Sequence, residues 1–132
     1  MNGEPLTIPE MLRRSARRFG PAMALWERPG DGPVSLTFGE LWERVVRCRA
    51  ALAQAGVGPG DHVGIIAPNS IRWAVAFLGI TSLGAVAVPI YFRLQPNEQA
   101  DLARKADVKF AVVGPTPAGT LPEPLPGVAQ TF

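Results

Sequence analysis

The spacing of apolar residues in the first third of the chain predicts two amphipathic helices around a β-hairpin. Apolar positions recur at helical intervals after residue 7 and again after residue 37, and each stretch begins Thr-x-x-Glu. That pattern is typical of a helix capping box. Residues 22–27 and 34–36 are expected to be strands, because they flank a turn rich in Pro, Gly and Asp. The order is therefore helix, hairpin and long helix.

From residue 62 onward the pattern changes to short apolar segments that alternate with helices. Residues 62–67, 85–90 and 108–113 are predicted strands, and 71–83 and 96–106 are predicted helices. Strands that are apolar on nearly every residue indicate a parallel sheet covered on both faces. The predicted fold class is α/β, a partial three-layer sandwich with a mainly parallel sheet in a βαβαβ run. Residues 1–113 form the expected subdomain, and the proline-rich 114–132 a linker or truncated continuation.

One stretch allows a different interpretation, because no residue from Trp73 to Ile90 is charged. This length approaches that of a membrane span and leaves open a small membrane-associated protein. Gly79, Gly84 and Pro89 interrupt the stretch, however. A buried helix followed by a buried strand explains it as well.

Composition excludes several classes of protein. Charged residues make up 18% of the chain and the net charge is +2, which is typical of a globular domain. The arginines at 13, 14, 17 and 18 are expected on a solvated helix face, and no nucleic-acid-binding module is present. Cys48 is the only cysteine, so neither an internal disulfide nor a metal site is expected. With no signal-peptide pattern in residues 1–10, a cytoplasmic setting is expected.

Two features that suggest chemistry have simpler explanations. The glycine-rich residues 56–60 precede a strand, whereas a phosphate-binding loop follows a strand and opens a helix. They are interpreted as a helix end and a turn. His62, the only histidine, begins a strand and is expected at the surface. No catalytic, cofactor-binding or metal-binding residue is assigned.

The candidate cleft residues follow from topology. Ligands of open α/β sheets bind beyond the carboxyl ends of the strands, which here are 68–70, 90–94 and 114–116. Asn69, Tyr91 and Arg93 are therefore possible cleft-facing residues. The alternatives are a helix N-cap for Asn69, and packing or surface pairing for Tyr91 and Arg93.

Five segments in order carry a family resemblance. They are Thr-Phe-Gly-Glu-Leu at 37–41, the Gly-Val-x-x-Gly-Asp-x-Val turn at 56–63, Pro-Asn-Ser with the apolar helix after it at 68–79, Gly-Ala-Val-Ala-Val-Pro at 84–89, and the helix start at 94–98. Over about residues 7–113 the chain resembles the amino-terminal portion of the AMP-forming adenylating enzymes. Within that family it looks most like an acyl-CoA synthetase acting on a carboxylic acid such as a fatty acid.

The resemblance implies a two-step reaction of a larger protein. A carboxylate attacks the α-phosphate of ATP, and the CoA thiol then displaces AMP from the acyl-adenylate, with Mg²⁺ offsetting phosphate charge. The family's phosphate loop ending in Pro-Lys, its Tyr-x-Thr-Gly-Asp motif and its late lysine have no counterpart here, because Lys105 and Lys109 stand in other contexts. ATP, Mg²⁺ and CoA are thus expected for the full-length parent and not for this chain.

The leading hypothesis is an amino-terminal fragment of an acyl-CoA synthetase that is not catalytic by itself. Its expected partners are the rest of the synthetase and a carboxylic acid, with no nucleic acid. The alternative is a non-catalytic binding or assembly module derived from that fold. Self-association is also possible, because a truncated sheet would expose its edges.

Overall fold

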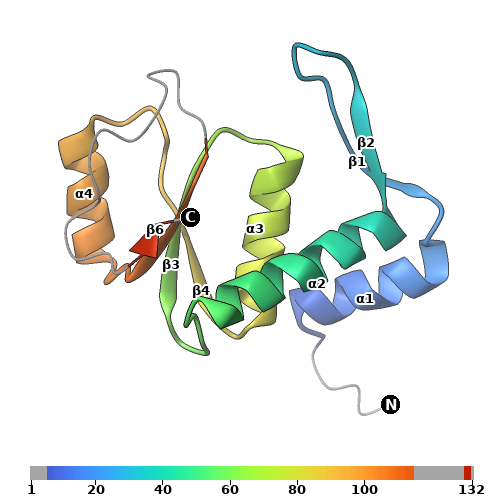
Figure 1. Cartoon of the computed structure of the whole chain (residues 1–132), viewed down its shortest axis with the longest axis horizontal. Helices are drawn as coiled ribbons and strands as arrows, with labels where there is room; N and C mark the ends of the chain where they lie inside the picture. The colour runs from blue at the N-terminus through green and yellow to red at the C-terminus, as the bar shows by residue number, and fades with distance from the viewer. Residues whose placement is uncertain (1–5, 115–129, 132) are drawn as a thin grey trace.

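The computed structural model describes residues 6–114 and 130–131 (Figure 1). In chain order the elements are α1 (Ile8–Phe19), β1 (Met23–Glu27), β2 (Val34–Thr37), α2 (Phe38–Gln54), β3 (His62–Ile66), α3 (Ile71–Ser82), β4 (Val86–Pro89), α4 (Pro96–Lys105), β5 (Phe110–Val113) and β6 (Gln130–Thr131). The α/β class is confirmed. So is the order of a helix, an antiparallel hairpin and a long helix before the parallel βαβαβ run.

Local chemistry explains where α2 begins and ends. The Thr37 hydroxyl accepts a hydrogen bond from the Glu40 N–H at 3.2 Å, and the Glu40 carboxylate accepts one from the Thr37 N–H at 2.8 Å. These bonds complete the capping box, and the bond from the Thr37 backbone is the main cause that lowers the pKa of Glu40. Gly56 follows the C-cap with a φ of 103°, a conformation that glycine adopts without strain.

β3 is the central strand of the main sheet. The strand order is β4-β3-β5-β6, and Val63, Ile65 and Ile66 of β3 are fully buried. Ile65 packs in one core cluster with Ile80 of α3, while Ile66 packs in another with Ala103 of α4. The two helices therefore cover opposite faces of the sheet, as Figure 1 shows.

β4 differs from expectation, because it is an edge strand and not a buried one. Val86 is 43% exposed and Pro89 is also exposed. The N–H groups of Val86 and Ile90 donate to β3 or to the residue before it, at 2.8 and 2.9 Å. Since alternate residues of a strand direct their N–H groups to opposite sides, the nitrogen of Pro89 faces away from β3 and carries no hydrogen. Pro89 therefore disfavours pairing of another strand with the exposed side of β4.

The other side of the sheet carries a strand that the apolar pattern does not predict. β6 pairs in parallel with β5, with Phe110 opposite Gln130 and Ala111 opposite Thr131. The rest of the proline-rich tail, residues 115–129 and 132, lies outside the described residues. Its interpretation as a linker or truncated continuation, and the subdomain boundary at residue 113, stay predictions.

The uncharged stretch that suggested a membrane span is divided between two elements. It begins within α3, a helix of 12 residues, turns at Gly84 and continues as β4. Within residues 6–114 and 130–131, no helix has both the length and the apolar character needed to cross a membrane.

α3 is packed on two sides, which explains why it is apolar nearly all round. One side contacts the sheet, and the other contacts a cluster built by α1, α2 and β2, with Leu41 and Val45 at its centre. α3 lies close to α2 at Gly79, where an added Cβ would lie 2.7 Å from the Sγ of Cys48. Burial at this contact raises the pKa of the Cys48 thiol.

We expect Gly79→Ala to destabilise the protein by about 1–3 kcal/mol, because the new methyl group overpacks the contact between α2 and α3. Helix propensity alone would make this substitution stabilising, because alanine is a better helix former than glycine by about 1 kcal/mol. A measured loss of stability would therefore report the close contact. Urea unfolding measures the change. In a Cys48→Ala background the cost should shrink; a Gly79→Ala protein as stable as the parent in both backgrounds would contradict the close contact.

We expect Val86→Asp to leave a cooperative thermal transition, with a loss of about 1 kcal/mol or less, because the edge position is open to water. The matched control is Val63→Asp on β3, where a buried unpaired carboxylate should prevent folding. Circular dichroism during heating compares the two. If both variants unfolded alike, the strand order would be wrong.

Candidate functional site

The chain reverses its direction across the sheet between β3 and β5. It leaves β3 for β4 on one side through α3, then crosses to β5 on the other side of β3 through α4. The carboxyl ends of β3 and β5 therefore form a topological switch point, the place where open α/β sheets bind ligands. Two cavities lie at this edge.

The first, which we call the switch-point cavity, has a volume of about 330 Å³. Its floor is formed where β3 and β5 end side by side, because the Gly114 N–H donates to the Ile66 carbonyl at 2.9 Å. A Cβ on Gly114 would lie only 2.6 Å from that of Ala67. The lining residues are mostly apolar: Ile65, Ala67, Pro68, Ser70, Arg72, Trp73, Ala76, Val112, Val113 and Gly114.

The second cavity lies on the β4 side and has a volume of about 580 Å³. It is lined by Ala67, Pro68, Asn69, Trp73, Pro89, Ile90, Tyr91 and Phe92. Ala67, Pro68 and Trp73 also line the switch-point cavity, so Trp73 belongs to the wall of both. The Trp73 ring is held by a stacked contact with Phe77, with centroids 5.5 Å apart and planes at 8°.

Two of the three candidate cleft residues meet in this second cavity. Asn69 and Tyr91 both line it, and Tyr91 is 59% exposed. Arg93 is exposed and does not line either cavity; its guanidinium carbon lies 5.4 Å from the centroid of the Phe92 ring. Asn69 is not the N-cap of α3, because Ser70 occupies that position. A role for any of the three in ligand binding stays a prediction.

The start of α3, which borders both cavities, is held by a residue that sequence reasoning missed. The Ser70 hydroxyl accepts from the Trp73 N–H at 3.0 Å, and the Glu27 carboxylate accepts from the Ile71 N–H at 3.1 Å. Glu27 ends β1, so this bond connects the hairpin to the carboxyl edge of the main sheet. No local pattern could identify the pair, because 44 residues separate its members.

The glycine-rich turn at residues 56–60 is engaged in internal hydrogen bonds, as its interpretation as a helix end and turn requires. The Gly58 N–H donates to the Asp61 carboxylate at 2.8 Å, and the Gly60 N–H donates to the Gly84 carbonyl at 2.9 Å. The turn joins α2 to β3 at the amino edge of the sheet. It therefore lies at the opposite end of β3 from the two cavities.

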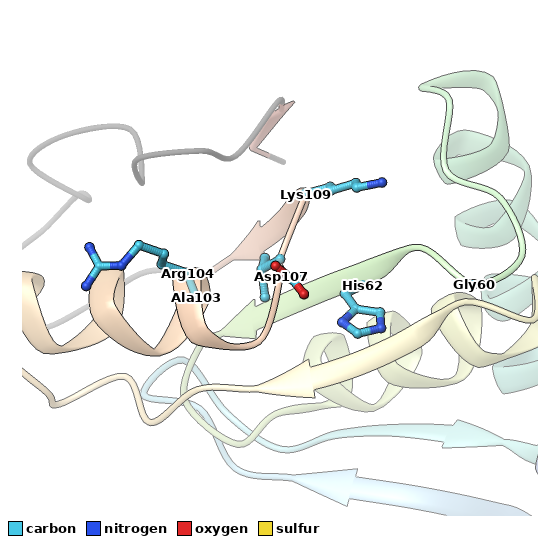
Figure 2. Close-up of a pocket in the computed structure, with 7 residues that line it drawn as sticks. Gly60, His62, Ala103, Arg104, Asp107 and Lys109 are labelled. Atoms are coloured by element: carbon cyan, nitrogen blue, oxygen red, sulfur yellow. The ribbon is translucent and has the colours of Figure 1, made fainter.

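A third cavity, of about 450 Å³, lies at that amino edge and contains His62 (Figure 2). His62 is half-buried and not at the surface as expected, because its Nδ1 lies 2.6 Å from the Ala106 carbonyl at the end of α4. A carbonyl can only accept, so Nδ1 carries the hydrogen and caps this helix end. In Figure 2 the Arg104 and Lys109 side chains extend away from the imidazole. The arrangement supports a structural role for His62.

The cavities at the carboxyl edge of the sheet are lined mostly by apolar side chains, with a few polar ones. Among the described residues that line the two cavities, none is Asp, Glu, His, Lys or Cys. Within the same described ranges, no three side chains of the His, Cys, Asp and Glu types lie together as metal ligands would. The polar side chains that line the two cavities include those of Asn69, Ser70, Arg72 and Tyr91.

Comparison with known proteins gives one family. Residues 12–131 match the AMP-binding enzyme family. The chain is 41% identical, over 120 residues, to a propanoyl:CoA ligase of Rhodococcus jostii that is named for a methyl-dioxo-octahydro-indenyl substituent. It is 32% identical, over 104 residues, to a long-chain-fatty-acid–CoA ligase of Mycobacterium tuberculosis. These alignments cover 91% and 79% of the chain.

The fold is shared as well. The N-terminal domain of FACL13 from Mycobacterium tuberculosis superimposes with a TM-score of 0.85 and 28% identity over 97% of the chain. The chain spans only 34% of that domain, and 22% and 20% of the two curated ligases. It corresponds to the amino-terminal region of such ligases.

We expect Glu27→Ala to destabilise the protein by about 1 kcal/mol, because the N-terminus of α3 loses a charged hydrogen-bond acceptor. Hydrogen exchange should show faster exchange of the Ile71 amide. Glu43→Ala, at an exposed position of α2, is the matched control and should change neither property. Unaltered protection of Ile71 in Glu27→Ala would exclude a role for this bond.

Proposed function

This chain belongs to the AMP-binding enzyme family, and from this premise we propose that it forms the amino-terminal part of an ATP-dependent, AMP-forming acyl-CoA ligase. The main support for the proposal is that the chain resembles CoA ligases both in sequence and in backbone structure. The sequence is 41% identical to one ligase over 91% of the chain, and the backbone matches another with a TM-score of 0.85. Fold alone would not support an activity, whereas identity at this level supports a shared one.

In the proposed reaction a carboxylic acid, such as a fatty acid, reacts with ATP to give acyl-adenylate and pyrophosphate, and the CoA thiol then displaces AMP. The residues of this chain do not suit the reacting phosphates. Its sequence has no glycine-rich loop that leaves a strand and opens a helix with a lysine, which is the arrangement that cradles phosphates. ATP, Mg²⁺ and CoA would be bound by the rest of the ligase.

The proposed part of this chain in the reaction is that of a scaffold. α1, α2 and the hairpin pack against α3, and α3 covers one face of the sheet. Asn69 follows β3 and Tyr91 follows β4, so these two strands bring both residues to the carboxyl edge of the sheet. There, with Arg93 on the same loop as Tyr91, they would face a cleft completed by another part of the protein. Residues 1–113 would be the subdomain that does this, with 114–132 leading onward.

The proposed setting is cytoplasmic. Its support is a single cysteine, and burial raises the pKa of the Cys48 thiol above its usual range. Such a cysteine packs as a small apolar side chain and suits a reducing compartment, in which disulfides are rare.

A chimera tests the proposal. The matching segment of the Rhodococcus jostii ligase is replaced by this chain, and acyl-CoA formation is measured with the acid for which that ligase is named. We expect an active chimera, because 41% identity over the segment preserves its packing. The same chimera carrying Val63→Asp should be inactive, because the central strand cannot bury a charge.

The isolated chain should show no exchange of pyrophosphate into ATP with any carboxylic acid. Exchange above a buffer control would show that the chain is catalytic by itself. A chimera that folds, binds ATP and still forms no acyl-CoA would contradict the proposed function. That result would favour a binding or assembly module.

A further inference from the structure

Gln99, in the first turns of α4, is a polar residue in the core. Its side chain is only 3% exposed, and among residues 6–114 it is the one buried residue that is polar or charged. Ala103, one turn further along the same helix, packs in an apolar core cluster. A leucine or methionine at position 99 would avoid the cost of taking an amide out of water. The buried amide therefore needs a hydrogen-bond partner.

That partner is the backbone of the loop between β4 and α4. The Gln99 Nε2 donates to the Phe92 carbonyl at 3.1 Å. At the two ends of the loop, the Ile90 N–H donates to a β3 carbonyl at 2.9 Å, and the Gln95 N–H donates to the Glu98 carboxylate at 2.8 Å. Gln99 therefore holds the middle of a loop whose ends are already fixed.

Phe92 contacts both of the candidate cleft residues on this loop. The Tyr91 and Phe92 rings meet edge to face, with centroids 5.5 Å apart and planes at 69°, and the guanidinium carbon of Arg93 lies 5.4 Å from the Phe92 centroid. The Phe92 ring itself packs against the core cluster that contains Ile66 and Ala103. Tyr91 and Phe92 both line the cavity on the β4 side. The position of Phe92 therefore determines where Tyr91 lies in that wall.

We propose that Gln99 is a positioning residue of the ligase, which holds the Phe92 carbonyl so that Tyr91 stays in the wall of the cavity on the β4 side. Gln99 is not among the residues that line this cavity, so it acts through the loop. A loop that is already in its binding conformation costs less to order when a ligand binds. Loss of the Gln99 donor should therefore raise a KM and leave kcat unchanged.

The first test uses the isolated chain and requires no activity. Gln99→Met keeps an unbranched side chain and removes the donor. We expect the Leu94 amide, which donates to the Tyr91 carbonyl at 3.3 Å, to exchange its hydrogen about fivefold faster, the fold-change that corresponds to one hydrogen bond of ordinary net strength. The Val108 amide, which donates to Ala103 at the other end of α4, should exchange at the rate of the parent.

The second test measures the kinetics of the chimera with the Rhodococcus jostii ligase, and this part of the inference rests on the proposed function. Tyr91→Ala identifies the substrate, whether acid, ATP or CoA, whose KM depends on the loop. Gln99→Met should raise the KM of that same substrate about fivefold. In the Tyr91→Ala background it should have no further effect, because Gln99 acts through Tyr91. Gln54→Met, the same substitution at the exposed end of α2, is the matched control and should change neither kcat nor KM.

Three results would overturn the inference: a Leu94 amide that exchanges as in the parent, equal acceleration at Leu94 and Val108, or effects of Gln99→Met and Tyr91→Ala on KM that are independent. A Tyr91→Ala chimera with unchanged KM values would also reject it. Failure of the proposed function is a different result. An active chimera whose KM values do not change in Gln99→Met would keep the ligase function and reject the positioning role. A folded chimera that forms no acyl-CoA would reject the function and, with it, the kinetic role of Gln99.

Discussion

The close approach of α3 to α2 at Gly79 is the constraint on which the rest of the structure depends. α3 has to cover the sheet on one side and complete the core of α1, α2 and the hairpin on the other. Only a residue without a side chain lets the helices approach until Cys48 contacts the backbone of α3. With α3 fixed in this way, the hairpin lies near enough for Glu27 to bind its first turn.

The position of the two cavities at the carboxyl edge of the sheet follows from the same arrangement. Since α3 and α4 lie on opposite faces, the connections from β3 and from β4 run in opposite directions, and a hollow opens where they separate. Its wall is Trp73, which α3 carries at its first turn and Phe77 supports by stacking. Among the described residues that line the two cavities, none is Asp, Glu, His, Lys or Cys. The chain spans 22% of the length of its ligase relative.

The fold was largely predictable, and the site only in part. Helix and strand positions depend on local periodicity and caps, as the capping box of Thr37 and Glu40 shows. Candidate residues were predicted at the carboxyl edge because parallel sheets generally bind ligands there. Of the three residues predicted in this way, Asn69 and Tyr91 line one cavity and Arg93 does not. The hydrogen bond of Glu27 to the start of α3 could not be predicted, because no local pattern links a residue to a helix start 44 positions away.

The sequence by itself determined the elements, the α/β class and the family resemblance, because each depends on residues close together in the chain. Tertiary structure alone decided which strand lies at the edge of the sheet. β3 and β4 are both apolar, yet β3 is enclosed by two neighbours and two helices, whereas β4 has one neighbour and exposes Val86. Tertiary packing also placed His62 under the end of α4 and left Arg72 beside an apolar cavity. Composition reports how apolar a strand is, but burial depends on what packs against it.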